Sequence, residues 1–126
     1  MALFRLGEFI LHSGSKSFWK IDCETLTDED WATLARIIYE SVPRFRRVIG
    51  IPKGGMKLAE ALEPYCSFEK GHPLLIVDDV LTTGKSMEKM KKDIGEDCIG
   101  AVVFARGKCP DWIESVVTVN NRLWNK

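Results

Sequence analysis

The feature that most constrains the fold is a continuous apolar run that ends in two carboxylates. Residues 74–77 read Leu-Leu-Ile-Val, Asp78 and Asp79 follow, and a loop rich in threonine, glycine and serine comes next. A strand with no polar alternation is buried on both faces, as in a parallel sheet covered by helices. Ligands of such sheets bind beyond the carboxyl ends of the strands. The run therefore predicts an α/β protein with a ligand site directly after this strand.

The remaining segments fit the same alternation of strands and helices. Thr27 followed by Asp30 resembles a helix capping box, and this helix must end before Pro43. Further helices are expected from about Met56 to Leu62 and after a loop at residues 80–85. Extended segments are expected at residues 3–11, 17–22, 47–51, 98–104 and 116–119. This order predicts an α/β fold with three layers, a mostly parallel, Rossmann-like sheet with helices on both faces.

Composition excludes several classes of function. The chain has 126 residues, and 18 lysines and arginines balance 18 aspartates and glutamates, so the formal net charge is zero. Such a surface is not built for nucleic acid or anionic lipid. No apolar run approaches the ~18–20 residues that cross a bilayer, and the N-terminus lacks the apolar stretch of a secretory signal. We therefore expect one cytoplasmic domain with no nucleic-acid partner and no membrane association.

The four cysteines are scattered along the chain. None forms a CxxC pair, and the two histidines are too dispersed to complete the clustered spacing that a zinc site requires. We expect buried thiols, with one disulfide or a reactive thiol as the alternatives. The residues concerned are Cys23, Cys66, Cys98 and Cys109.

The loop after the acidic pair has the composition of an anion site. Thr82, Thr83 and Ser86 supply hydroxyls, Gly84 leaves the backbone open, and a predicted helix begins directly afterwards. Free N–H groups and the helix dipole both favour an anion at such a place. Two adjacent carboxylates repel each other, so ligand hydroxyls, a divalent cation or both must stabilise them. A phosphate cradle beside hydroxyl acceptors describes a sugar-phosphate site.

Gly84-Lys85-Ser86 also imitates the end of a Walker A loop. That motif requires a glycine five residues before its second glycine, and Asp79 holds this position here. A carboxylate there repels the phosphates of a nucleotide, which argues against a P-loop NTPase.

A second glycine-containing loop also lies between a predicted strand and a predicted helix. Its glycines permit close approach to a ligand, and Lys53 adds positive charge for an anion. The loop reads Gly50-Ile51-Pro52-Lys53-Gly54-Gly55. Taken alone it is equally compatible with an ordinary glycine turn.

The segment LLIVDDVLTTGKS resembles the phosphoribosyl pyrophosphate (PRPP) signature of type I phosphoribosyltransferases. The resemblance implies that Asp78 and Asp79 bind the ribose hydroxyls, act in catalysis and lie at a Mg²⁺ site, either directly or only through PRPP and water. It implies PRPP contacts from Asp78, Asp79, Val80, Leu81, Thr82, Thr83, Gly84, Lys85 and Ser86, with the 5′-phosphate held by residues 82–86. The second loop resembles the pyrophosphate loop of the same family, formed here by Pro52, Lys53, Gly54 and Gly55.

Two further segments resemble orotate phosphoribosyltransferases. Residues 9–22, FILHSGSKSFWKID, are similar to the opening of those enzymes, and VVFAR, ending in Arg106, resembles the strand whose arginine faces the orotate carboxylate. An arginine fork suits a planar carboxylate. The base-binding residues expected on this basis are Arg106, Thr82, Lys16 and Trp19. The resemblance implies a single domain over residues 1–126, with a base-binding hood at 1–25 and an α/β core at 26–120.

The chain departs from the family pattern in three places. His12 stands where the family has a lysine, and the aromatic residues near the base are shifted to Phe18 and Trp19. Only residues 65–73 separate the second helix from the acidic strand, which is too short for the extra strands and the mobile catalytic loop of the family. We therefore assign Lys70 and His72 to an exposed turn and give them no catalytic role.

These features predict a phosphoribosyltransferase, a pentosyltransferase that uses PRPP and Mg²⁺. Orotate is the preferred acceptor, giving orotidine monophosphate and pyrophosphate; uracil, a purine base or another amide nitrogen are alternatives. The resemblance also implies a homodimer. A non-catalytic regulatory module that binds PRPP or a nucleotide is the second hypothesis, because the middle segment is short. A plain α/β domain with an unrelated ligand is the third.

Overall fold

The computed structural model describes residues 2–11 and 14–119, and within them the strands form two separate sheets. Four parallel strands lie in the order β3-β4-β5-β6, and β1 and β2 form an antiparallel hairpin. The strands are β1 (Phe4–Ile10), β2 (Lys16–Ile21), β3 (Arg47–Gly50), β4 (Leu74–Leu81), β5 (Cys98–Arg106) and β6 (Ile113–Val119). His12, whose place in the family pattern differs, lies outside the described residues.

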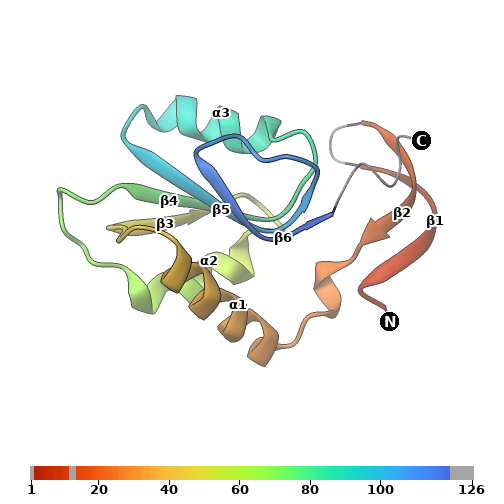
Figure 1. Cartoon of the computed structure of the whole chain (residues 1–126), viewed down its shortest axis with the longest axis horizontal. Helices are drawn as coiled ribbons and strands as arrows, with labels where there is room; N and C mark the ends of the chain where they lie inside the picture. Colours follow the sequence, from red (N-terminus) through yellow and green to blue (C-terminus); the bar gives the residue numbers. More distant parts are fainter. Residues whose placement is uncertain (1, 12–13, 120–126) are drawn as a thin grey trace.

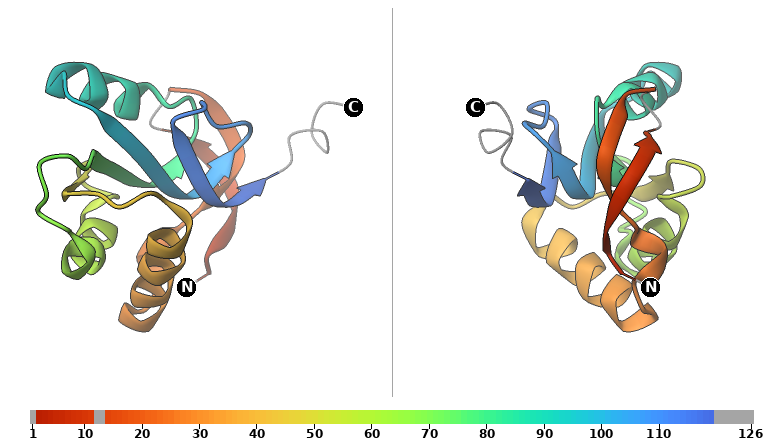
Figure 2. Two further views of the ribbon diagram at one scale, coloured as in Figure 1. Left: turned by 60° about the vertical axis from the view of Figure 1, so that its left-hand side comes forward. Right: turned by 90° about the vertical axis from the view of Figure 1, so that its right-hand side faces the viewer.

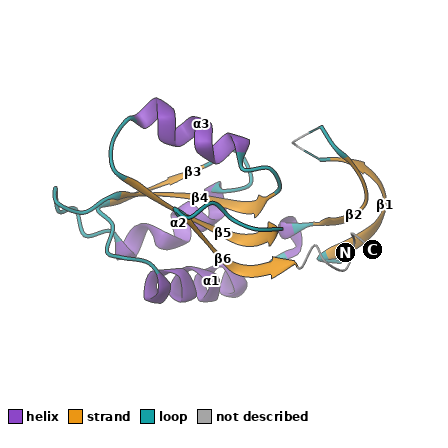
Figure 3. Cartoon of the chain, turned by 45° about the horizontal axis from the view of Figure 1, so that its top comes forward, coloured by secondary structure: helices purple, strands orange, loops and turns teal. Residues whose placement is uncertain are grey.

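Helices cover both faces of the parallel sheet, so the predicted three-layer α/β fold is confirmed. Helices α1 (Asp28–Ser41) and α2 (Met56–Leu62) pack on one face, and α3 (Lys85–Ile94) packs on the other (Figure 1, Figure 3). Two single 3-10 turns, Cys23–Thr25 and Glu63–Tyr65, lead into α1 and away from α2. None of the described helices is long and apolar enough to cross a membrane.

The apolar run of β4 is buried on both sides, as its sequence predicts. Leu75 and Val77 belong to the core under α1 and α2, whereas Leu74 and Ile76 belong to the core under α3. Successive side chains of a strand point to opposite faces, so neighbouring residues join different cores. This double burial holds the strand rigidly and delivers the acidic pair to its carboxyl end.

Local signals also define α1 as expected. The Thr27 hydroxyl accepts the Asp30 N–H at 3.1 Å, and the Asp30 carboxylate accepts the Thr27 N–H at 2.9 Å, so the capping box is complete. The helix ends at Ser41, two residues before Pro43. Its apolar stripe buries Trp31, Ala35 and Ile38 against the sheet.

Strand β4 runs further than its apolar residues indicated. We expected a loop at residues 80–85, but β4 continues through the acidic pair to Leu81. The extension exists because Asp78, Val80 and Leu81 pair in parallel with β5. Pairing with the long strand β5 thus keeps the chain extended although the residues after Val77 are no longer all apolar. The loop before α3 is therefore only residues 82–84.

The β1–β2 hairpin stands beyond the carboxyl ends of the sheet strands (Figure 1, Figure 2). The arrows of β4, β5 and β6 point toward it in Figure 3. One link to the sheet is an edge-to-face contact between the Phe4 and Phe104 rings, whose centroids lie 6.1 Å apart. The hairpin is therefore a wall at the edge of the sheet where a parallel α/β protein binds ligands.

Candidate functional site

A cavity of about 380 Å³ opens between the hairpin and the carboxyl ends of the sheet strands. Four parts of the chain meet there: the end of β4 with the start of α3, the loop after β3, the end of β5, and the hairpin. Its lining residues are Phe9, Ile10, Leu11, Lys20, Ile21, Ile51, Pro52, Gly54, Asp78, Asp79, Val80, Leu81, Thr82, Thr83, Gly84, Lys85, Ser86, Met87 and Arg106. The whole predicted PRPP segment thus borders a single cavity.

The acidic pair lies half-buried in the cavity wall. The Asp78 carboxylate accepts the N–H of Asp79 at 2.8 Å, and the Asp79 carboxylate accepts the N–H of Val80 at 2.7 Å. Burial, followed by the hydrogen bond and charge of Asp79, raises the pKa of Asp78 to about 8. Burial and Asp79 thus disfavour the ionised form of Asp78, which a cation or a ligand hydroxyl would favour.

The loop between β4 and α3 has the geometry of an anion cradle. Gly84 adopts the left-handed conformation with φ 80°, and α3 begins with the next residue. The Thr83 hydroxyl accepts the Lys85 N–H at 3.4 Å, while Thr82 and Ser86 also line the cavity. The first N–H groups of a helix lack intrahelical acceptors and carry the positive end of its dipole. The cavity therefore has a floor suited to a phosphate group.

The loop after β3 lies against the acidic pair. A Cβ atom on Gly54 would stand 2.5 Å from the nearer Asp79 carboxylate oxygen, so this position accommodates only glycine while Asp79 stays in place. Gly55 is buried below the loop and donates its N–H to Ile51 at 2.8 Å. The peptide bond between Pro52 and Lys53 is cis. Of the four predicted pyrophosphate residues, Pro52 and Gly54 line the cavity, whereas Lys53 is exposed beside it and Gly55 supports the turn.

Arg106, at the end of β5, enters the cavity wall from the opposite side and contacts the hairpin. Its Nη2 donates to the Ser17 hydroxyl at 2.9 Å, its Nη1 donates to the Trp19 carbonyl at 3.4 Å, and its guanidinium carbon lies 3.6 Å from the Trp19 ring centroid. Burial lowers the pKa of Arg106, which nevertheless stays charged because arginine titrates far above neutrality. The hairpin thus holds the guanidinium in one place.

The predicted base-binding residues occupy different positions. Arg106 and Thr82 line the cavity, but Trp19 stands behind Arg106 and Lys16 is exposed on the hairpin, and neither of these two lines it. The residues that sequence reasoning missed include Phe9, Lys20 and Ile21 in the lining and Ser17 behind Arg106. The sequence offered one signal for these residues, the period of two in a strand, which places Ser17, Trp19 and Ile21 on one face of β2. In the structure Ser17 is buried between two exposed neighbours.

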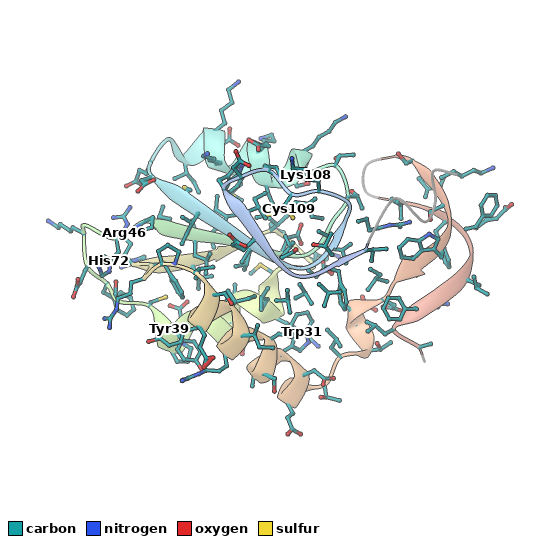
Figure 4. All side chains as sticks on the ribbon, viewed as in Figure 1. Trp31, Tyr39, Arg46, His72, Lys108 and Cys109 are labelled. Atoms are coloured by element: carbon teal, nitrogen blue, oxygen red, sulfur yellow. The ribbon has the colours of Figure 1, made fainter. Side chains whose placement is uncertain are left out.

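The short segment before β4 lies at the other end of the sheet. The Ser67 hydroxyl and His72 Nδ1 lie 2.7 Å apart, and His72 Nε2 lies 3.3 Å from a Glu69 carboxylate oxygen. Figure 4 shows His72 beside Arg46, far from the hairpin. Neither Lys70 nor His72 lines the cavity, and Lys70 is exposed whereas His72 is half-buried.

The acidic pair is also the place where a divalent cation fits. Within residues 2–11 and 14–119, no group of three or more histidine, cysteine, aspartate or glutamate side chains could hold a metal ion by itself. Mg²⁺ commonly binds through one or two carboxylates together with substrate phosphates. Burial and the neighbouring Asp79 raise the pKa of Asp78, and a cation beside the pair would oppose this shift. Asp78 and Asp79 therefore suit an ion that arrives with a phosphate-bearing ligand.

Several solved structures with the same fold are orotate phosphoribosyltransferases. An orotate phosphoribosyltransferase from Aeropyrum pernix has a TM-score of 0.71 and 24% identity over 93% of this chain and 88% of that chain. The Leishmania donovani UMP synthase has a TM-score of 0.72 and 20% identity over 93% of this chain, which spans 34% of that protein. A Mycobacterium tuberculosis orotate phosphoribosyltransferase in complex with inorganic phosphate has a TM-score of 0.66 and 21% identity over 90% of this chain and 86% of that chain.

Sequence comparison adds no closer likeness, since no protein-family model and no curated protein match the chain. The structural similarities nevertheless cover nearly all of it. The chain has the type I phosphoribosyltransferase fold, and its overall architecture is similar to that of orotate phosphoribosyltransferases, as the resemblance of the sequence predicted.

Proposed function

We propose that the chain is a phosphoribosyltransferase that uses PRPP and Mg²⁺ to transfer phosphoribose to orotate, forming orotidine monophosphate and pyrophosphate. One observation carries the proposal: a single cavity joins the acidic pair, the cradle at the start of α3, the glycine loop at Gly54 and the guanidinium of Arg106. The fold, shared with phosphoribosyltransferases, supports the same reaction class.

The lining of the cavity supports PRPP binding. The ribose hydroxyls would donate to Asp78 and Asp79, which compensates the burial of these carboxylates. The 5′-phosphate would take the N–H groups and hydroxyls of residues 82–86, at the positive end of α3. The loop after β3 then borders the pyrophosphate, since Gly54 allows close approach beside Asp79 and the exposed Lys53 adds positive charge.

The proposed reaction requires no covalent bond between the protein and its substrates. The acceptor nitrogen, having lost its proton, attacks C1 of the ribose as the bond to pyrophosphate breaks and its electron pair leaves with the pyrophosphate. Positive charge builds on the ribose ring, and the carboxylates of Asp78 and Asp79 would stabilise it from nearby. Mg²⁺, when bound with PRPP, would neutralise the departing pyrophosphate. Holding both substrates in one cavity supplies the proximity that such a displacement needs.

Orotate is the proposed acceptor because of Arg106. A planar guanidinium binds a planar carboxylate through two parallel hydrogen bonds, and the contacts with Ser17 and Trp19 orient it before any ligand arrives. Uracil and purine bases lack the carboxylate, so they are the acceptors against which orotate is to be compared.

A PRPP- or nucleotide-binding module without turnover is the rival function. It draws support from the short segment at residues 66–73, which contains no strand or helix and lies away from the cavity. A closing loop normally excludes water from such a reaction, and this segment does not reach the cavity to provide one.

A turnover assay separates the two functions. Purified protein is incubated with PRPP, Mg²⁺ and a panel of bases, and pyrophosphate release is measured alongside nucleotide formation. Orotidine monophosphate formation with orotate supports the enzyme, whereas PRPP binding without any product establishes the binding module. Asp79→Asn is expected to abolish PRPP binding, and Asp111→Asn, on the exposed connection after β5, serves as the matched control. Unchanged PRPP affinity in Asp79→Asn would contradict the site assignment.

We also propose that the protein is a cytoplasmic homodimer. The apolar side chains of Leu6 and Phe18 in the hairpin are 91% and 66% exposed, and contact with a second copy would remove apolar surface from water. The four cysteines are all free, which fits a reducing compartment. Light scattering after size-exclusion chromatography tests the assembly, and a monomer at micromolar concentration would exclude it.

A further inference from the structure

Lys20 brings a second cationic side chain to the hairpin side of the cavity. Lys20, in β2, and Arg106, in β5, both line it, although they lie far apart in the sequence. The other lining residues that come from the hairpin and its turn are apolar: Phe9, Ile10, Leu11 and Ile21. A cation in such apolar surroundings interacts with the part of a ligand that lies against the hairpin side of the cavity.

The ammonium group of Lys20 is held against an aromatic ring. Its Nζ lies 4.9 Å from the centroid of the Phe9 ring, and both side chains are half-buried. Contact with the ring face favours this position through a cation–π interaction. Across residues 2–11 and 14–119, Lys20 forms no ion pair with a carboxylate. Its charge is therefore available to a ligand.

We propose that Lys20 is a specificity-determining residue, which selects an acceptor that carries a carboxylate over an uncharged base. The inference rests on the proposed function, because it assigns the hairpin side of the cavity to the acceptor. The acidic pair and the start of α3 occupy the other side and suit the sugar phosphate. An uncharged base beside Lys20 would desolvate the ammonium and offer no anionic partner, whereas a carboxylate would satisfy it.

The two product nucleotides provide the sharpest test. Orotidine monophosphate and uridine monophosphate differ only in the carboxylate on the base, and neither reacts when pyrophosphate is absent. Calorimetric titration of the wild type should show tighter binding of orotidine monophosphate. Lys20→Met should lower that affinity about 10-fold, the loss expected for a hydrogen bond to a charged group, and should change uridine monophosphate affinity less than about twofold.

Two controls isolate the charge from the site. Lys20→Arg, which keeps the cation, should retain most of the preference for orotidine monophosphate. Lys108→Met makes the same exchange at an exposed position just beyond β5 and outside the cavity lining, and should change neither affinity. Figure 4 marks Lys108.

Several outcomes would overturn the inference. One is a wild type with no preference for orotidine monophosphate. Another is equal loss of both nucleotides in Lys20→Met, and a third is a matching loss of PRPP affinity, which would place Lys20 at the phosphates. Failure of the proposed function looks different: orotidine monophosphate then binds in a Lys20-dependent way, yet the wild type releases no pyrophosphate from PRPP with any base.

Discussion

The guanidinium of Arg106 lies 3.6 Å from the centroid of the Trp19 ring, although the two residues are 87 positions apart in the chain. The contact joins the end of β5 to the hairpin and presents Arg106 to the cavity. Trp19 does not line the cavity itself. In the function proposed above it would be a positioning residue, which acts on the acceptor through Arg106.

Loss of the Trp19 ring should weaken acceptor binding selectively. Trp19→Ala removes a cation–π contact of roughly 1–2 kcal/mol, so the KM for orotate should rise about 5- to 30-fold while the KM for PRPP stays the same. Steady-state kinetics with each substrate varied in turn measure both values. Trp19→Phe, which retains a ring, should restore most of the affinity. An equal rise in both KM values would show that Trp19 only supports the fold.

Removal of the Asp78 charge should stabilise the ligand-free protein at alkaline pH. The fold raises the pKa of Asp78 from 3.8 to about 8, chiefly through burial. Protonated Asp78 therefore contributes its full stabilisation of the folded state below about pH 4, and this stabilisation is lost as the pH rises to 8. At pH 8, Asp78→Asn should have a higher Tm than the wild type and a free energy of unfolding larger by at least about 1 kcal/mol. At pH 5 the difference in the free energy of unfolding should be smaller.

Thermal unfolding without Mg²⁺ or PRPP, repeated from pH 5 to 8, measures this difference. Asp111→Asn, at an exposed position, supplies the comparison. A difference between Asp78→Asn and the wild type that stays constant with pH would show that Asp78 is already ionised in the folded protein.

PRPP binding should release a proton near neutral pH. If the ribose hydroxyls and Mg²⁺ favour the ionised form of Asp78, binding lowers a pKa that stands at about 8 in the free protein. The affinity for PRPP should then rise with pH and level off above about pH 8. Calorimetry at pH 7 in buffers of different ionisation enthalpy counts the protons released. Proton release identical in Asp78→Asn and the wild type would assign it to PRPP.

A methyl group at Gly54 should disrupt PRPP binding. The added Cβ would stand 2.5 Å from an Asp79 carboxylate oxygen, so either Asp79 or the loop must move. Gly54→Ala should therefore weaken PRPP binding about 10-fold or more, since it displaces a charged hydrogen-bonding partner. Gly71→Ala is the matched control, because a Cβ there meets open space within 4 Å. Equal PRPP affinities for the two variants, measured by calorimetry, would show that Asp79 does not contact PRPP.

Local signals in the sequence determined much of this protein. The apolar run from Leu74 predicts a doubly buried strand because no polar residue interrupts it, and Thr27 with Asp30 begins α1 because a capping box needs only four residues. The composition of residues 82–86 likewise predicts an anion cradle, since hydroxyls, glycine and a helix start lie together in the chain. Each of these features depends on neighbours within one or two turns of backbone.

Tertiary structure alone decided how the cavity wall is built. The side chains of β2 alternate between two faces, so the sequence permits either Trp19 or Lys20 to face the cavity. A shift of the strand register by one residue would exchange the two faces. Packing of the hairpin against the end of β5 decides which side chains line the cavity, because Ser17 and Trp19 contact Arg106 whereas Lys20 and Ile21 line the cavity. The proton on Asp78 is decided in the same way. Its pKa depends on burial by segments distant in sequence, which only the folded chain brings together.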